Sequence, residues 1–405
     1  MGTEVKYPVE ALRVSGRLPD DRHKVISLSE AREGGYLKME RGKLYLNVIG
    51  SRSFLDYEKY DIHGRRSDYY GDFYQGATIV PQPCWFVDVV DSSDPKIVVV
   101  QTSRRAEARG KVRAHVGPIP VEREFIYGVL TSAEVLPFQH LPPNTAVLPI
   151  VPASDGFKLL RKEEARQQGY PHLAEWLRKA EEVWGKVRGE KEEKMDIYER
   201  IDYQGGLTGQ NPRKKYKVVY LRSGTHLASS VVVNEPINAG GYVLNGVVIE
   251  STLYRFETDN REEAFYLAAV LNSSVLDDLI KPLQSRGAFG ERDIHKKPLE
   301  FPIPKYDPSN ALHRKLAELG EDATRRASSQ LPSILASLKY DAKLEQQGFL
   351  TPQEVGRLRG ALREALSDII REIDSLTVEL LKTGAAREKG KEAGLLKFLK
   401  ANKSD

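Results

Sequence analysis

The C-terminal region carries a seam of apolar side chains at helical spacing, and this seam restricts its fold to packed helices. Apolar residues occupy positions 355, 358, 362, 366, 369, 373, 376 and 380, so the steps are three or four residues. That spacing places them on one stripe of a helix, which must be buried against another helix. Thr351, Pro352 and Glu354 form a capping box with proline at the first helical position, which predicts where the helix begins.

The seam has two candidate partners, one inside the chain and one outside it. Segment 331–346 could pack on it as the other arm of a helical hairpin, and the short turn 346–351 favours this arrangement. A second copy of the chain could instead pair through 355–380 as a homodimer. We therefore expect a helical hairpin or coiled coil over 306–383, followed by a basic tail over 384–405.

The N-terminal region, residues 1–135, is predicted to be β-rich. The stretch "YLKMERGKLYLNVIG" alternates polar and apolar residues around Arg41 and Gly42, which predicts a hairpin with its turn there. Further strands are expected in "TIVPQPCWFVDVV", "KIVVVQTS" and "REFIYGVL", which are rich in β-branched and aromatic residues. Pro81 and Pro83 place the first of these at a sheet edge or at a strand start.

Residues 136–305 are predicted to form a mixed α/β domain with a helical lead-in. The lead-in is "PHLAEWLRKAEEVWGKV", with proline in its first turn. Strands are expected in "KYKVVYL", "LASSVVV" and "NGVVIESTLYRF". Asp259 or Asn260 then caps "REEAFYLAAVLNSSVLDDLI", one helix or a pair. The whole chain is therefore expected to belong to the α+β class.

Composition excludes several classes of protein. The 405 residues suffice for two or three domains, and 40% hydrophobic with 29% charged content is ordinary for a globular chain. No run of about eighteen apolar residues occurs, and the N-terminus lacks a signal peptide, so we expect a cytoplasmic protein without membrane contact. The single cysteine, Cys84, has apolar neighbours and is expected in the core.

The familiar catalytic motifs are missing. The sequence has no Walker loop, no Gly-x-Gly-x-x-Gly after a strand, no His-Glu-x-x-His and no Gly-x-Ser-x-Gly. We therefore expect no catalytic residue, no metal and no cofactor in this chain. Glu192 and Lys194 have the Glu-x-Lys spacing of many nucleases, but no aspartate on a strand accompanies them.

Basic residues gather instead in three glycine-containing or polar segments, although the net charge is only +4. Segment 200–222 alone holds six Arg or Lys against one Asp, with amide side chains and tyrosines between them. Such segments can neutralise phosphates and read base edges. The candidate DNA-binding residues are Arg104, Arg105, Arg109, Gln204, Gln210, Asn211, Arg213, Lys214, Lys215, Arg222, Arg286, Arg292, His295, Lys296 and Lys297.

Four stretches in this order carry a resemblance to a known family. They are "YYGDFYQGATIVPQPCWFV", "RIDYQGGLTGQNPRKKYKVVYLRSGTHLASSVV", "EEAFYLAAVLNS" and "SRGAFGERDIHKKPLEFPIPKYDPSN". Together, over about residues 68–320, the chain resembles the C-terminal half of large adenine-specific DNA methyltransferases of restriction–modification systems. That half carries a TaqI-like target-recognition domain. The resemblance implies that "QSRGAFGERDIHKK" faces DNA through Arg286 and Arg292, unless a salt bridge to Asp293 makes Arg292 structural.

The departure from that family bears on activity. The catalytic Asn-Pro-Pro-Tyr or Asp-Pro-Pro-Tyr motif is absent, since the nearest string is Asn211-Pro212-Arg213. The resemblance thus implies a DNA sequence-recognition (specificity) subunit or fragment that is not catalytic alone. S-adenosylmethionine is then expected only on a partner methyltransferase chain, with double-stranded DNA as the shared ligand. The alternatives are a nuclease with an unrecognised site, and a helical scaffold protein that works through 355–380.

Overall fold

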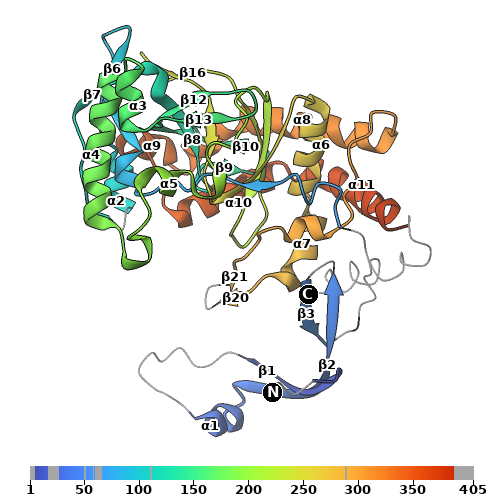
Figure 1. Cartoon of the computed structure of the whole chain (residues 1–405). Helices are drawn as coiled ribbons and strands as arrows, with labels where there is room; N and C mark the ends of the chain where they lie inside the picture. Colours follow the sequence, from blue (N-terminus) through green and yellow to red (C-terminus); the bar gives the residue numbers. More distant parts are fainter. Residues whose placement is uncertain are drawn as a thin grey trace.

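The computed structural model describes residues 5–16, 27–49, 52–57, 59, 66–109, 112–287 and 290–386. It confirms the α+β class, with strands prevailing in the N-terminal part and helices at the C-terminal end. Figure 1 shows a large body and a β-arm that extends away from it. No helix in the described ranges is long and apolar enough to cross a membrane.

The arm is a three-stranded antiparallel sheet in the order β1 (Val9–Gly16), β2 (Leu37–Ile49) and β3 (Arg52–Asp56). The predicted turn at Arg41 and Gly42 is wrong, because β2 runs straight through both residues and pairs Gly42 with Ala11. A Cβ on Gly42 would lie 2.9 Å from the Tyr57 ring. The glycine therefore makes room for an aromatic ring, whereas the sequence pattern indicated a reversal of the chain.

One core of the body lies between small sheets and the lead-in helix. The strands β5 (Val87–Asp91), β6 (Ile97–Thr102) and β7 (Ile119–Glu122) form one sheet. A second sheet has the order β11 (Asn144–Val147), β8 (Ile126–Leu130) and β18 (Val247–Ile249). Pro81 and Pro83 precede β5, as predicted. The helix α4 (Pro171–Val187) packs over this core, where Trp176 Nε1 donates to the Cys84 carbonyl at 2.9 Å. Cys84 is fully buried, as expected, and burial raises its pKa to about 12.

The second core contains the antiparallel sheet β15–β14–β19–β4 with helices against it. Its strands are β4 (Tyr74–Gln75), β14 (Tyr216–Leu221), β15 (Ser229–Val233) and β19 (Leu253–Thr258). Asn260 caps α6 (Arg261–Asn272), and α7 (Ser274–Ile280) follows it, so the predicted helical stretch is a pair. The stretch "NGVVIESTLYRF" supplies two strands to two different sheets, since β18 (Val247–Ile249) pairs with β8 (Ile126–Leu130).

The C-terminal helices close this second core. They are α8 (Ala311–Ser337), α9 (Tyr340–Gln347), α10 (Pro352–Ala365) and α11 (Ser367–Ala386). Thr351 caps α10 as predicted, and the apolar seam is split between α10 and α11 at Leu366. Its residues are buried against α8, α6 and α7, so the partner is inside the chain and includes more than segment 331–346. A homodimer through 355–380 would have to use a seam that is already covered.

The remaining elements are short. They are α1 (Leu28–Glu33), α2 (Arg104–Arg109), α3 (Lys162–Gln167), α5 (Ile197–Ile201), β9 (Val135–Leu136), β10 (Gln139–His140), β11 (Asn144–Val147), β12 (Ile150–Pro152), β13 (Phe157–Leu159), β16 (Ile237–Asn238), β17 (Val243–Leu244), β20 (Arg286–Gly287) and β21 (Gly290–Glu291).

A pair of helical glycines tests the packing of α8 on α6. A Cβ on Gly320 would lie 2.1 Å from the Phe265 carbonyl oxygen, whereas one on Gly356 would meet nothing within 4 Å. We expect Gly320→Ala to lower the free energy of unfolding by about 1–3 kcal/mol through overpacking. Gly356→Ala should raise it by about 0.5–1 kcal/mol through helix propensity. Urea unfolding of both variants measures this, and equal effects would contradict the close helix contact.

Candidate nucleic-acid interface

The 284–297 loop, predicted to face DNA, is docked on the 222–226 turn that follows β14. The Ile294 and His295 amides both donate to the Arg222 carbonyl, at 3.1 and 2.8 Å, and the Gly224 amide donates to the Arg292 carbonyl at 2.7 Å. The middle of the loop forms the two-stranded ribbon β20–β21. Residues 297–300, which follow the loop, form a single 3-10 turn. Leu299, Phe301 and Ile303 behind it enter the core.

Four positively charged or titratable side chains converge beside this junction. Arg52 comes from the arm strand β3, Arg222 from the end of β14, and His295 and Lys297 from the loop. Arg222, Lys297 and Arg52 all act electrostatically on the His295 imidazole, which places the four groups close together. We call this set the cationic cluster. Arg222 forms no ion pair within the described residues, so its charge is available to a ligand.

His295 sits at the centre of the cationic cluster in a left-handed backbone conformation. Its φ is 44°, a value that is costly for a residue with a side chain and that tends to occur at functional positions. The amide bond to the Arg222 carbonyl holds the residue there. Burial, followed by the Arg222 guanidinium, lowers the pKa of His295 below its ordinary value. Asp293 Oδ1 lies 3.9 Å from Nε2 and partly opposes this shift.

Two tyrosines lie near the cationic cluster, because Arg222 and Arg52 act electrostatically on Tyr254. Tyr220 and Tyr254 lie opposite each other on β14 and β19, with their rings stacked at 5.3 Å. The Tyr220 hydroxyl is buried and has no hydrogen-bond partner within the described part of the chain. Burial, and then the neighbouring Tyr254 and Tyr70, raises the pKa of Tyr220 well above its usual range. A buried hydroxyl without a partner is costly, so a ligand or water that supplies an acceptor would be stabilised there.

A buried carboxylate positions two arginines next to the phenols. The Glu300 side chain is fully buried, with Oε2 2.9 Å from Arg66 Nε and Oε1 3.6 Å from Arg52 Nε. The Arg66 guanidinium also lies 4.4 Å from the centre of the Tyr70 ring. Glu300 therefore neutralises part of the local charge and fixes two guanidinium groups that arise far apart in the sequence.

The other candidate residues of the loop differ in the hydrogen bonds that they already make. Lys297 donates to the Asp293 carbonyl, and Lys296 donates to the Tyr70 carbonyl at 2.8 Å. The Asp293 carboxylate accepts a hydrogen bond from Ser285 Oγ. Both lysine ammonium groups thus use a hydrogen bond to tie the loop to its surroundings, and contribute positive charge there. The backbone of Arg292 is part of the junction described above, whereas the side chain of Arg286 lies outside the described structure.

The 204–215 segment lies at the opposite end of β14 from Arg222. A six-residue strand spans about 20 Å, so the two basic regions do not converge. Gln210 is fully buried, which corrects its prediction as a surface contact. Its side-chain Nε2 donates to the Ile249 carbonyl, and its Oε1 accepts from the Ile249 amide. Lys214 pairs with Asp259 and Lys215 with Glu235. Gln204, Asn211 and Arg213 occupy the loop itself, where Asn211 Oδ1 accepts from the Arg213 amide.

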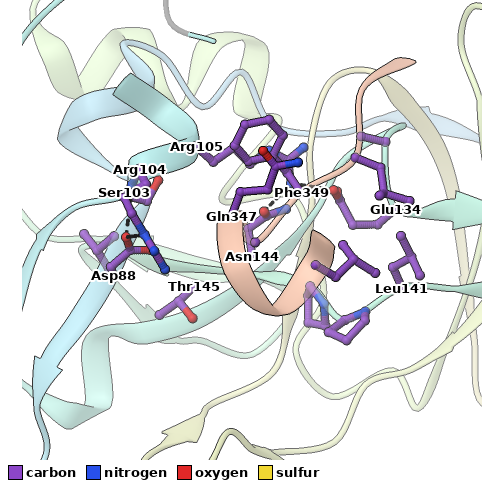
Figure 2. A pocket seen from close by; sticks show the side chains of 17 residues that line it. Asp88, Ser103, Arg104, Arg105, Glu134, Leu141, Asn144, Thr145, Gln347 and Phe349 are labelled. Carbon is purple, nitrogen blue, oxygen red and sulfur yellow. Dashed lines mark hydrogen bonds and ion pairs between the residues drawn. The ribbon is translucent and has the colours of Figure 1, made fainter. Parts of the chain in front are cut away.

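The 104–109 segment forms α2 and lines a pocket of about 300 Å³ (Figure 2). Arg105 pairs with Glu134 and hydrogen-bonds Asn144, and both charged side chains are largely buried. Arg104 is exposed, lies 3.4 Å from Asp88 and donates to the Gln346 carbonyl at 3.1 Å. Arg105 is therefore corrected to a structural ion pair. The side chain of Arg109 lies outside the described structure.

The nuclease alternative gains no support from geometry. Glu192 lies in a 3-10 turn and is 3.3 Å from Arg200. Across the described residues, no group of three His, Cys, Asp or Glu could hold a metal ion.

Sequence reasoning missed Arg52, Arg66, Tyr70 and Glu300. Tyr70 lies within a stretch quoted for the family resemblance, but it was not assigned a role. Arg52 and Arg66 occur in segments without a basic run, and Glu300 is an isolated acid. Only the tertiary structure brings them beside Arg222, because their contacts join positions more than two hundred residues apart.

Comparisons with known proteins give limited likeness. No known family model and no curated protein matches the chain. Among solved structures it is similar to the Type IIL restriction-modification enzyme MmeI in complex with DNA, with 9% identity and a TM-score of 0.44, over 91% of this chain and 40% of that one. It is also similar to the type IIG restriction endonuclease BpuSI, with 15% identity and a TM-score of 0.31, over 80% and 32%. The chain spans less than half the length of either enzyme.

The two neighbouring arginines of α2 separate a structural role from a ligand-binding role. Arg105→Ala would leave the buried Glu134 carboxylate without its cation, and should lower the free energy of unfolding by about 3 kcal/mol. Arg104→Ala removes an exposed pair and should change it by less than about 0.5 kcal/mol. Denaturant unfolding with DNA titration of the folded protein measures both. A large loss of DNA affinity in folded Arg105→Ala would return that residue to the interface.

Proposed function

We propose that this chain is a DNA-binding, sequence-recognition component of a restriction–modification system. The observation that carries this proposal is the cationic cluster, where Arg52, Arg222 and Lys297 all act electrostatically on His295. Like charges from three segments repel one another, so their convergence is favoured when an anion lies between them. DNA phosphates are such anions, and Arg and Lys contacts supply most of the affinity of DNA-binding proteins.

The surroundings of the cationic cluster fit a nucleic acid better than a small anion. Two residues separate the β20–β21 ribbon from the 3-10 turn 281–283, and the ribbon projects from the body beside the arm (Figure 1). A two-stranded ribbon has dimensions that the DNA major groove admits. The ribbon is joined to the cationic cluster by the Arg292 to His295 segment. Phosphate contacts at the cluster would therefore place the ribbon next to base edges, where sequence is read.

The methyltransferase assignment rests on the sequence resemblance over about residues 68–320. On that basis we propose a specificity subunit or fragment without catalytic activity of its own. A separate chain would carry the Asn-Pro-Pro-Tyr motif and S-adenosylmethionine for adenine methylation. The exposed sheet of the arm is one surface that a catalytic chain could use. Its exposed apolar residues include Leu12, Val14, Val48 and Leu55.

Salt-dependent DNA binding tests the central proposal. If about six phosphates are contacted, affinity for a duplex should fall on the order of a thousandfold between roughly 50 and 200 mM salt. The double variant Arg52→Ala/Arg222→Ala should weaken binding to every sequence and reduce the salt slope by about two. Arg325→Ala is the matched control, because Arg325 is 77% exposed on α8 and pairs with Asp322. Fluorescence anisotropy measures the affinities, and a salt-independent or unchanged affinity would refute the assignment.

A second prediction concerns the methyl donor, S-adenosylmethionine. Calorimetric titration of the chain with S-adenosylmethionine should give no one-to-one binding, because the sequence lacks a glycine-rich loop between a strand and a helix. The same titration after adding a catalytic partner should show binding. A micromolar complex with the chain alone would contradict the proposed division of labour, while leaving DNA binding intact.

A further inference from the structure

We propose that His295 is a proton-linked contact to a DNA phosphate, so that DNA binding takes up a proton at this imidazole. The proposal rests on the DNA binding proposed above and adds a specific ligand atom and protonation state. The contact would be a hydrogen bond from the protonated ring to a non-bridging phosphate oxygen. Its consequence is an affinity that rises as the pH falls.

The geometry gives His295 a fixed place among the cations. Two consecutive amides, of Ile294 and His295, hold the Arg222 carbonyl, and the left-handed φ of 44° at His295 sets the direction of its side chain. The side chain is 35% exposed, so the ring is restricted and still reachable by a ligand. A phosphate that approaches Arg222 and Arg52 would therefore come close to the imidazole as well.

A bound phosphate would reverse the electrostatic effect of the surroundings on the protonation of the imidazole. In the free protein, burial, Arg222 from the end of β14, Lys297 from the loop and Arg52 from β3 all disfavour the proton. Asp293 alone favours it, and its carboxylate already accepts a hydrogen bond from Ser285. A phosphate adds negative charge at hydrogen-bond distance and offsets the nearby cations, which favours the imidazolium.

The direction of the pH dependence follows from this comparison. The pKa of His295 lies below its ordinary value in the free protein and is raised in the complex. Between these two pKa values the complex binds more protons than the free protein. Binding then strengthens as the pH falls through that window, by up to about tenfold per pH unit for one proton. Above the pKa of the complex, His295 is neutral in both states and contributes no pH dependence.

Two other histidines separate this effect from general titration. His115 is exposed, and its Nδ1 lies 2.7 Å from Glu107 near α2, away from the cationic cluster. His226 belongs to the 222–226 turn, and its Nδ1 lies 2.7 Å from the buried Asp277 carboxylate. Each of these rings therefore already has a carboxylate as its partner within the chain.

The experiment measures duplex DNA affinity between pH 6 and pH 8.5 at constant ionic strength. For the native chain, affinity should rise toward low pH by up to about tenfold per unit. His295→Gln should lose this slope, and His115→Gln should keep it. Calorimetry in two buffers of different ionisation enthalpy should detect proton uptake by the native chain and none by His295→Gln.

A second variant distinguishes the loss of the titrating ring from a folding defect. Asparagine tolerates the left-handed conformation better than most residues, so His295→Asn should keep the junction while removing the titrating ring. Thermal melting of both variants checks this. Salt-dependent DNA binding with no pH slope in the native chain, or with the slope retained in both variants, would overturn the role of His295 alone. Loss of the slope in His226→Gln instead would place the proton on the other imidazole and overturn it too. No DNA binding at any pH would refute the proposed function itself.

Discussion

The contact between the 284–297 loop and the 222–226 turn is the constraint on which the candidate site depends. One carbonyl, that of Arg222, accepts both the Ile294 and the His295 amide, and the Arg292 carbonyl binds back to Gly224. Backbone hydrogen bonds do not depend on side-chain identity, so the junction fixes where Arg222 and His295 stand whatever their charge. The ribbon β20–β21 is then carried in a defined position relative to the cluster. Without this junction, the basic residues would be scattered over separate loops.

The positive charges at the junction repel one another, and a buried carboxylate offsets part of this repulsion. Glu300 is buried between Arg66 and Arg52, which are also oriented by it. Lys296 and Lys297 direct their ammonium groups to backbone carbonyls. Arg222 remains without an ion pair in the described residues, and burial, followed by Arg222, lowers the pKa of His295, which disfavours one further charge. This is the usual pattern of a binding site, where local stability is given up in favour of a ligand.

Regular elements could be predicted from the sequence where a period and an end signal agreed. The helices α4 and α10 had proline at the first helical position, and the strands β6, β14 and β15 carried runs of β-branched residues. Gly42 misled because a strand glycine that admits a ring looks the same as a turn glycine. The split of "NGVVIESTLYRF" between two sheets depends on partners distant in sequence. Pairing of this kind is not visible in local periodicity.

Site residues were harder to predict, because basic character does not reveal burial or pairing. Arg105 and Gln210 looked like surface donors, yet both satisfy buried groups. Arg222 and His295 were both candidates, but only the fold shows that they are neighbours. Arg52 had no signal in the local sequence. Composition could indicate a candidate anion-binding surface, but only tertiary contacts decide which residues belong to it.

The second basic segment shows how the same strand can carry two different kinds of loop. Below residues 204–215 lies a buried charge network, in which Lys217 Nζ donates to the Val247 carbonyl at 2.7 Å and lies 3.8 Å from Glu257. Burial lowers the pKa of Lys217 to about 8. Glu257 also pairs with Arg255 at 2.9 Å and accepts from the Asn211 amide at 3.1 Å, while Arg255 binds the Gly209 carbonyl. Such a network fixes the loop's conformation from within, since removing one member would leave a buried charge unpaired. At the other end of β14, Arg222 forms no ion pair with any residue that the structure describes, so the junction lacks a buried network of this kind.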